Sequence, residues 1–391
     1  MNESLTIGFD AKRAVHNVTG LGNYSRLVID ALSSSYDRSK LILFAAKMRE
    51  NSPLQELLER DNVKLCTPSN PVAKVLPFVW RSFGMVKDWP KNNLDIFHGL
   101  SNELPLNLAS SSCATVVTIH DLIWHKAPQD YSPIDRMIYE FKYRKSAENA
   151  TRIIAVSQRT KEDIVNDWQI DPEKIDVIYQ GCNSIFSEHV SLDKIAEVKK
   201  KYNLPEQYIV SVGNVVSHKN QLLAVRALRA LPHHIKLVII GKANSNYKSE
   251  IKRFIDENRL LNRVIWPQNV PNEDLPAIYA GAIMSSYISK YEGFGIPIVE
   301  SLSVGVPVIA SSGSCLEEAG GDGALYIDPD SVPSYVETAK AIIDKPLLRK
   351  DLIEKGLKHV KKFNSADFAA AMFNTYNKAI SDFRTKPTPT T

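Results

Sequence analysis

The stretch Tyr291-Glu-Gly-Phe-Gly-Ile-Pro-Ile-Val-Glu300 follows an apolar run, residues 282–289, that has the composition of a buried strand. It turns through two glycines and enters a helix at Pro297, because proline suits the first helical position. Gly293 and Gly295 let a ligand approach the backbone closely and let N–H groups point toward it. The stretch therefore predicts a strand–loop–helix unit of a parallel α/β sheet, with an anion site at the helix N-terminus.

Two carboxylates border the predicted anion site. We expect Glu292 to lie on the loop and Glu300 to lie in the first turn of the helix, both facing the space above its N-terminus. Carboxylates are poor ligands for anions but good acceptors for hydroxyl groups. Amides for phosphate beside carboxylates for hydroxyls indicate a nucleotide sugar. A solvated loop acid and a helix-capping acid are the alternative interpretation of this pair.

Length and composition limit the class of protein. The 391 residues exceed a typical single core, so we expect two domains. A net charge of +4, from 48 basic and 44 acidic side chains, argues against nucleic acid as a partner. The four cysteines form no CxxC pair, and the first residues have no signal-peptide pattern. No window of about 20 residues stays apolar. We therefore expect a protein of the cytoplasm or of the inner face of the membrane.

Both halves of the chain alternate short apolar runs with amphipathic stretches, which is typical of doubly wound parallel sheets. The predicted strands are residues 5–9, 40–44, 63–66, 96–97, 114–119, 152–156 and 175–178, and then 208–212, 236–240, 264–265, 282–289, 308–310 and 324–327. We expect Rossmann-like domains over residues 1–185 and 203–365, facing each other across a cleft. A last helix, residues 366–383, is expected to cross back to the first domain, and the tail, residues 384–391, to be disordered.

A glycine and a lysine follow the first strand of the second half. Gly213 permits a sharp turn, and Lys219 supplies a cation near the start of a helix. Two glutamates near a diphosphate repel it unless a cation compensates for their charge, so we expect Lys219 to bind the diphosphate. A surface lysine is the alternative interpretation.

A second pair of glycines occurs in Thr19-Gly-Leu-Gly-Asn-Tyr24. Gly20 and Gly22 at the start of a helix suit the close approach of phosphate or sugar, and we expect the amide of Gly22 to contact the donor. A dinucleotide fingerprint needs a third glycine where this chain has Ser25, so the pattern argues against a nicotinamide site.

Two histidines follow apolar strands. His120 follows residues 114–119, and a residue at the carboxyl end of a buried strand projects into the ligand crevice. We expect His120 to donate to a sugar hydroxyl or to stabilise charge at the reacting carbon. His98 follows residues 96–97 and is expected on the acceptor side. A structural histidine with satisfied hydrogen bonds is the alternative for each.

Together with Gly305-Val-Pro-Val-Ile309 after the short helix, these elements resemble the retaining glycosyltransferases of family GT4, which have the GT-B fold. The resemblance covers nearly the whole chain and is strongest in the E-x7-E element formed by Glu292 and Glu300. In that family the loop of Lys219 often reads G-R-x4-K. Here Asn214 occupies the arginine position, which leaves Lys219 as the cation of this loop.

The resemblance implies a role for each candidate residue. It places the acceptor on the first domain and the nucleotide sugar on the second. The residues implied in donor binding are Gly20, Gly22, Gly213, Lys219, Gly293 and the amides of Phe294, Gly295 and Ile296. Glu300 accepts from the ribose, Glu292 accepts from the sugar, and His120 lies beside the sugar. Val270 meets the base through its backbone. No cofactor and no metal are implied, and Asp328-Pro-Asp330 is expected to be an ordinary turn.

The reaction that the resemblance implies is transfer of a hexosyl unit from a nucleoside-diphosphate sugar to a hydroxyl acceptor in glycan or surface polysaccharide synthesis. GDP- and UDP-linked donors both fit, and mannose is favoured because the opening Asp10-Ala-Lys12 and the pair Lys219-Asn220 resemble mannosyltransferase-like members. The acceptor is a glycan or a lipid-linked glycan. The aromatic and basic residues 71–93 fit peripheral membrane contact, with a helix packed on its own sheet as the alternative. A nucleotide-sugar epimerase and a non-catalytic nucleotide-sugar-binding protein are the alternative functions.

Overall fold

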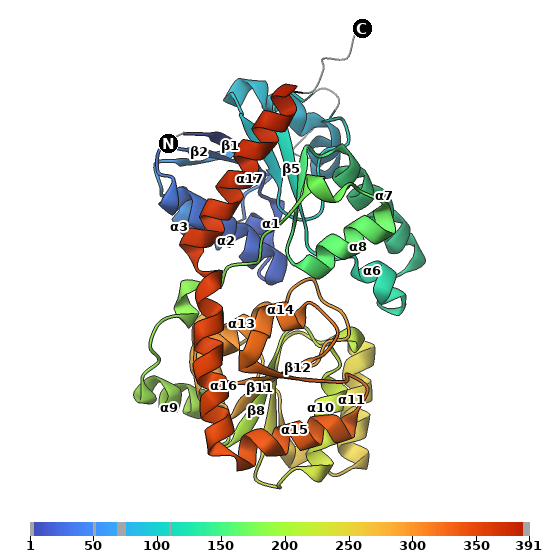
Figure 1. The fold of residues 1–391 in the computed structure, drawn as a ribbon, viewed down its shortest axis with the longest axis vertical. Helices are drawn as coiled ribbons and strands as arrows, with labels where there is room; N and C mark the ends of the chain where they lie inside the picture. Colours follow the sequence, from blue (N-terminus) through green and yellow to red (C-terminus); the bar gives the residue numbers. More distant parts are fainter. Residues whose placement is uncertain (1–3, 50–51, 69–75, 109–110, 386–391) are drawn as a thin grey trace. The chain divides into compact units, whose positions relative to one another are not determined.

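The computed structural model describes residues 4–49, 52–68, 76–108 and 111–385, which form two compact units (Figure 1). Unit 1 contains the described residues of Met1–Leu122, Ser132–Gly181 and Ser365–Thr391. Unit 2 contains Ile123–Tyr131 and Cys182–Asn364. Each unit is built on its own parallel sheet, so the prediction of an α/β chain with two Rossmann-like domains is confirmed.

Unit 1 has a seven-stranded parallel sheet in the order β3-β2-β1-β4-β5-β6-β7. Its strands are β1 (Thr6–Asp10), β2 (Lys40–Phe44), β3 (Val63–Cys66), β4 (Ile96–Gly99), β5 (Ala114–Ile119), β6 (Arg152–Ala155) and β7 (Ile175–Val177). The strands at the centre are buried on both faces, as a parallel sheet covered by helices requires. The strand order reverses between β1 and β4, which makes the carboxyl ends of these two strands the switch point of the sheet.

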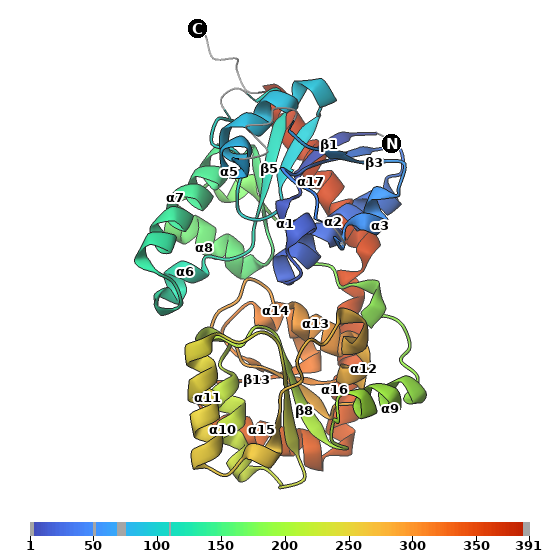
Figure 2. The ribbon, with the colours of Figure 1, turned by 180° about the vertical axis from the view of Figure 1, so that it is seen from behind.

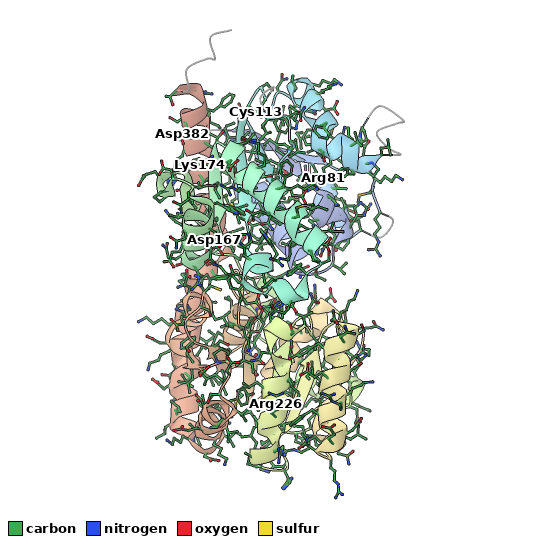
Figure 3. The ribbon with its side chains drawn as sticks, turned by 90° about the vertical axis from the view of Figure 1, so that its right-hand side faces the viewer. Arg81, Cys113, Asp167, Lys174, Arg226 and Asp382 are labelled. Atoms are coloured by element: carbon green, nitrogen blue, oxygen red, sulfur yellow. The ribbon has the colours of Figure 1, made fainter. Side chains whose placement is uncertain are left out.

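The helices of unit 1 cover both faces of this sheet (Figure 2). They are α1 (Lys12–His16), α2 (Gly20–Ser35), α3 (Gln55–Leu58), α5 (Pro77–Val79), α7 (Pro133–Asn149), α8 (Gln158–Trp168) and α17 (Ser365–Thr385). The last helix packs against α2 and β5, and the ring of its Phe373 stacks on Tyr36 with centroids 4.0 Å apart. Near its end Asp382, labelled in Figure 3, accepts from Arg152 Nη1 at 2.8 Å.

Unit 2 has a six-stranded parallel sheet in the order β10-β9-β8-β11-β12-β13. Its strands are β8 (Tyr208–Val212), β9 (Lys236–Ile240), β10 (Val264–Ile265), β11 (Met284–Tyr287), β12 (Val308–Ser311) and β13 (Ala324–Ile327). The order reverses between β8 and β11. The loops that follow these two strands therefore meet at the switch point, where ligands of open α/β sheets bind.

The helices of unit 2 are α6 (Ile123–Lys126), α9 (Leu192–Lys201), α10 (Gln221–Ala227), α11 (Ser245–Glu257), α12 (Leu275–Ala280), α13 (Ile296–Ser303), α14 (Leu316–Gly320), α15 (Val332–Asp344) and α16 (Pro346–His359). Among the helices that the structure describes, none is long and apolar enough to cross a bilayer.

The units differ from the predicted domains of residues 1–185 and 203–365 in three places. Ile123–Tyr131 belongs to unit 2, although these residues lie within the predicted first domain, residues 1–185. Unit 2 begins at Cys182, because α9 packs against α12 instead of forming a linker. The last helix runs to Thr385, so the first two residues of the tail that we expected to be disordered are helical. The rest of that tail, residues 386–391, lies outside the described residues.

The apolar face of α17 should contribute strongly to the stability of unit 1. Met372 is fully buried against the first half of the chain, whereas Asn374 on the opposite face is exposed. We expect Met372→Ala to lower the free energy of unfolding by about 2–4 kcal/mol, because it leaves a cavity between the helix and the sheet. Denaturant unfolding measures this change. Asn374→Ala is the control, and equal stability of the two variants would contradict the packing.

Candidate functional site

The turn between β11 and α13 requires its glycine. Gly295 has φ of +116°, and a Cβ at this position would lie 2.8 Å from Leu316 Cδ2. Its carbonyl oxygen accepts from Ile298 N–H at 2.9 Å and so closes the first turn of the helix, with Ile296 as the first helical residue. Phe294 anchors the turn, since its buried ring meets Phe363 edge-to-face at 5.4 Å.

Lys219 and Glu292 form an ion pair in the loops that follow β8 and β11. The side chain of Lys219 is 15% exposed and that of Glu292 is 14% exposed, so neither charge is fully solvated. Tyr287, the last residue of β11, completes the cluster. It accepts from Lys219 Nζ at 2.8 Å and donates to Glu292 Oε1 at 2.9 Å. Each charge of the cluster therefore has a partner, which a buried ion pair requires.

The charges around Glu292 keep it ionised. Burial alone would raise the pKa of its carboxyl, but the ammonium of Lys219 and the nearby His218 outweigh burial and hold this pKa below the ordinary value. Burial and the neighbouring Glu292 raise the pKa of Tyr287 well above its ordinary value, so Tyr287 keeps its proton and remains a donor. The cluster thus contains one cation, one anion and one neutral hydroxyl.

Glu300 lies in a different environment. It is the fifth residue of α13, so the expectation that it lies in the first turn of the helix is wrong. Because Gly295 turns the chain directly into Ile296, the helix starts earlier than Pro297 and Glu300 falls in its second turn. Burial raises the pKa of Glu300 to about 7, and the hydrogen bond from Tyr279, at 3.3 Å, opposes this shift only in part. Glu300 therefore changes its charge near neutral pH, whereas Glu292 does not.

Gly213 leaves room beside this cluster. It has φ of +135°, and a Cβ there would lie 3.8 Å from both Lys219 Cδ and the ring of Tyr287. Its N–H donates to Ile240 O at 2.9 Å, so the glycine extends the ladder between β8 and β9. Gly213 therefore offers a ligand room instead of a hydrogen bond, because its amide already donates within the sheet.

A segment from the first half of the sequence supports the loop of Lys219. Asp130, in the segment Ile123–Tyr131, accepts from the ring of His218 at 2.7 Å and from the hydroxyl of Ser217. The carbonyl of His218 in turn accepts from the N–H of Lys290 at 2.7 Å. The sequence does not indicate a role for Asp130, because no local pattern relates it to His218, which lies 88 positions away.

The predicted base-binding residue lies in a neighbouring loop of unit 2. Val270 follows β10 and is partly buried against the core that contains Ile278 and Tyr208. Its position at the carboxyl end of the sheet does not contradict the predicted contact with a base, and that contact remains a prediction.

The glycines of α2 lie in different surroundings. Gly22 donates its N–H to Thr19 O at 2.9 Å, and a Cβ at Gly22 would lie 1.8 Å from Asn17 O. Close packing against Asn17 explains why this position is glycine, and the expected contact of its amide with the donor remains a prediction. Gly20 is exposed, and a Cβ there would meet nothing within 4 Å.

His120 is buried and neutral. Its Nε2–H donates to Leu100 O at 2.9 Å, and its Nδ1 lies 3.3 Å from Gln180 Nε2, which donates to it. Burial lowers the pKa of His120 to about 4. In the ligand-free protein its ring proton is therefore donated to the backbone, and the expected role of His120 beside the sugar remains a prediction. Nδ1 is the ring atom that a ligand could address, in exchange for Gln180.

The surroundings of His98 favour the alternative interpretation, a structural histidine with satisfied hydrogen bonds, and its place on the acceptor side remains a prediction. His98 is fully buried, with Nδ1 at 2.8 Å from the hydroxyl of Tyr376 and Nε2 at 2.8 Å from that of Thr118. Thr118 continues to the hydroxyl of Tyr24 at 3.0 Å. Burial lowers the pKa of His98 to about 3. This chain of hydrogen bonds joins α17 to β4, β5 and α2.

The structure brings together one part of the predicted site. Lys219, Glu292 and Gly213 lie in one cluster, and Gly295, Ile296 and Glu300 belong to the adjoining turn and helix. Gly20, Gly22, His98 and His120 belong to unit 1. Within the described ranges of the chain, no group of three His, Cys, Asp or Glu side chains is arranged to hold a metal ion. Tyr287 of the cluster is not among the predicted site residues, although its place at the end of a buried strand is a signal for it.

Comparisons with known proteins cover both units. Residues 18–184 match the family described as Glycosyltransferase Family 4, and residues 194–359 match Glycosyl transferases group 1. O-antigen chain mannosyltransferase B of Escherichia coli is 25% identical over 389 residues, 95% of this chain and 99% of the relative. O-antigen chain mannosyltransferase RfbU of Salmonella typhimurium is 27% identical over 230 residues, 59% of this chain and 61% of the relative.

The fold also matches a solved structure. The crystal structure of HepE of Anabaena in complex with UDP-glucose has a TM-score of 0.76 to this chain at 18% identity, covering 96% of this chain and 100% of HepE. At this identity the likeness concerns the fold alone, and it confirms the predicted GT-B class.

The raised pKa of Glu300 makes stability depend on pH. The folded pKa of about 7 lies above the ordinary value of 4.5, so stability that is present below pH 4.5 is lost as pH rises toward 7. Glu300→Gln removes the ionisation. Between pH 5 and pH 8 we expect the free energy of unfolding of wild type to fall by roughly 2–3 kcal/mol more than that of the variant. Denaturant unfolding at both pH values measures the difference. Glu337→Gln, which changes an exposed residue of α15, is the control, and parallel pH curves for wild type and Glu300→Gln would contradict the assignment.

Proposed function

Because this chain belongs to the family 4 glycosyltransferases and is a hexosyltransferase, we propose that its donor is a nucleoside-diphosphate mannose and that the anomeric configuration is retained. The acceptor in this proposal is a hydroxyl of a growing surface polysaccharide, carried on a lipid or free. The single observation that carries the proposal is the cluster of Lys219, Glu292 and Tyr287 at the switch point between β8 and β11.

The cluster suits a ligand that bears both phosphates and hydroxyls. An ammonium binds a diphosphate as a point charge, and an ionised carboxylate accepts from sugar hydroxyls. In the free protein Lys219 neutralises Glu292. When a donor binds, its diphosphate competes for the ammonium, and hydroxyls of the sugar become the new donors to Glu292. The ion pair thus stabilises the two charged side chains when no ligand is bound, and both side chains can exchange their partner for a ligand.

Retention follows in this proposal from attack on the face that the leaving group occupies. The bond from the anomeric carbon to the phosphate oxygen breaks, and the bond from that carbon to the acceptor oxygen forms on the same face. The acceptor proton passes to the leaving phosphate oxygen, so no external base is needed. Lys219 stabilises the charge that develops on the leaving diphosphate, which is the electrostatic contribution expected to dominate.

In this proposal Glu300 accepts hydrogen bonds from the ribose of the donor. Two adjacent hydroxyl groups of a ribose donate well to an ionised carboxylate, and a carboxyl whose pKa lies near 7 gains charge when such donors arrive. The amides of Gly295 and Ile296 at the start of α13 are proposed for the diphosphate. From unit 1, Nδ1 of His120 is proposed as a hydrogen-bond acceptor, and no proton donation is assigned to this ring.

The preference for mannose comes from the relatives. O-antigen chain mannosyltransferase B of Escherichia coli aligns along nearly its whole length, and RfbU of Salmonella typhimurium is also described as a mannosyltransferase. The HepE structure was solved with UDP-glucose, but its likeness is one of fold. Binding measurements with GDP and UDP would show whether the base of the donor is guanine or uracil.

Removal of either charge of the pair should stop transfer. We expect Lys219→Met and Glu292→Gln to lower the rate of transfer by about 100-fold or more, because each removes an interaction with the donor that forms as charge develops. The assay measures nucleoside diphosphate released from GDP-mannose and UDP-glucose with a panel of hydroxyl acceptors. Thermal unfolding of each variant checks that the fold is retained.

The matched control lies on the same loop as Glu292. Lys290 pairs with Asp330 at the surface and is about half exposed. Lys290→Ala removes a cation near the site without touching the cluster, so transfer should remain close to that of wild type. Wild-type rates in folded Lys219→Met and Glu292→Gln would contradict the proposed function.

A further inference from the structure

His218 is a nearly buried histidine beside the ion pair of Lys219 and Glu292. It directly precedes Lys219 in a short 3-10 helix, Ser217–Lys219, in the loop that follows β8. Its side chain is only 10% exposed, although both ring nitrogens are polar. After Lys219, a charge on His218 is the strongest positive influence on the ionisation of Glu292. The ring therefore lies close to the ion pair.

The backbone of His218 is held by the loop that follows β11. Its carbonyl oxygen accepts from Lys290 N–H at 2.7 Å and from the hydroxyl of Ser289 at 3.2 Å. Both donors lie in the loop that leads from β11 to Glu292. The ammonium of Lys290 itself pairs with Asp330. The two loops of the switch point are thus joined at His218, which keeps this residue beside the ion pair.

Asp130 holds the side chain of His218. One oxygen of its carboxylate accepts from Nδ1 of the ring at 2.7 Å, and the other accepts from the hydroxyl of Ser217. An ionised carboxylate can only accept, so the proton of the neutral ring lies on Nδ1. The same contact stabilises the protonated ring, in which both nitrogens donate. Asp130 is therefore a positioning residue that determines which ring nitrogen is left for a ligand.

The second ring nitrogen is available for binding. Among the residues that the structure describes, none forms a hydrogen bond with Nε2 of His218. This atom is not one of the fully enclosed polar atoms that lack a partner, so it reaches solvent. The ring is thus held at one nitrogen and open at the other, within hydrogen-bonding loops that already carry the ion pair.

The charges around the ring favour an anion as its ligand. Asp130 and Glu292 contribute two negative charges beside the loop of Lys219, and Lys219 contributes one positive charge. A diphosphate that takes Lys219 from Glu292 adds further negative charge. Protonation of His218 supplies a second positive charge, in contact with Asp130 and close to Glu292. The protonated ring then donates from Nε2, and phosphate oxygens are strong acceptors for such a donor.

We propose that His218 binds the diphosphate of the donor as an imidazolium, donating from Nε2–H to a phosphate oxygen while Asp130 holds Nδ1–H. This assignment rests on the proposed function, which places the diphosphate beside Lys219. The proton on Nε2 is taken from solvent when the nucleotide binds and returns to solvent when the nucleoside diphosphate leaves. During transfer, His218 and Lys219 together stabilise the charge on the leaving diphosphate.

Nucleotide binding should therefore depend on pH. Because a bound diphosphate favours the protonated ring, the contribution of His218 to affinity falls as pH rises through the range in which histidine titrates, about pH 5 to 8. Glu300 acts in the opposite sense, since its ionised form accepts from the ribose and is populated above pH of about 7, its pKa. Burial raises the pKa of Tyr247 and of Tyr287, so both keep their protons. The difference between wild type and a variant of His218 isolates this ring.

Calorimetry with GDP and UDP in buffers of different ionisation enthalpy measures affinity and proton uptake together. With the preferred nucleotide at pH 7, we expect wild type to take up about half a proton more than His218→Gln. At pH 6 this variant should bind about tenfold more weakly than wild type, because glutamine does not carry the charge. Asp130→Asn should lose the same uptake, and Asp130→Glu should restore part of it. His234→Gln, an exposed histidine before β9, is the control and should match wild type.

Nitrogen NMR of wild type with isotope-labelled histidine rings tests the same step without a substitution. The signals of His218 are identified by their loss in the spectrum of His218→Gln. Addition of GDP or UDP should move the Nε2 signal from the position of an unprotonated nitrogen to that of a protonated one, while Nδ1 stays protonated. An Nε2 signal that stays unprotonated in the complex would overturn the proposal.

Two calorimetric results would also overturn it. One is equal affinity and equal proton uptake in wild type and folded His218→Gln. The other is loss of the uptake in His125→Gln, an exposed histidine of the segment Ile123–Tyr131, with the uptake intact in His218→Gln. Lys219→Met separates this inference from the proposed function. If Lys219→Met weakens nucleotide binding and His218→Gln does not, the proposed donor site stands and the role of His218 fails. If neither weakens it, both fail.

Discussion

The ion pair between Lys219 and Glu292 is the interaction on which the candidate site depends. Each side chain is about one-seventh exposed, and a charge in that position is costly unless a partner is held in contact with it. The fold supplies the contact through topology, since β8 and β11 are neighbours at the switch point and their loops carry one partner each. Gly213 leaves space beside the pair, and Asp130 holds the residues that precede Lys219. A donor that bears phosphates and hydroxyls can replace both halves of the pair at once.

The two acids of the E-x7-E element differ because their surroundings differ. Glu292 has an ammonium in contact and stays ionised, while Glu300 has only the hydroxyl of Tyr279 and is close to its midpoint at neutral pH. In unit 1 the buried polar groups serve the fold instead. His98 and Thr118 connect the last helix of the chain to its first half, so residues nearly 280 positions apart stabilise one sheet.

The strands and the switch points could be predicted from sequence because buried parallel strands read as short apolar runs between glycine turns. Lys219 and Glu292 could be predicted as site residues because each lies in a loop that follows such a strand. The sequence does not indicate contacts that no local pattern encodes. Gly22 is explained by the carbonyl of Asn17, His98 by a tyrosine on the last helix, and Asp130 by a histidine of the other half of the chain. Glu300 was expected in the first turn of the helix but lies in the second, because the turn at Gly295 lets the helix begin at Ile296, before Pro297.

The central claim is that Lys219 is shared between Glu292 and the diphosphate of the donor. Calorimetry of GDP and UDP binding to wild type, Lys219→Met, Glu292→Gln and the double variant tests this claim most directly. We expect Lys219→Met to bind the preferred nucleotide more weakly. We expect Glu292→Gln to bind it more tightly, because the ammonium of Lys219 loses its competing partner. The double variant should then bind like Lys219→Met. Binding by Glu292→Gln that is equal to or weaker than wild type, or unchanged binding by Lys219→Met, would contradict it.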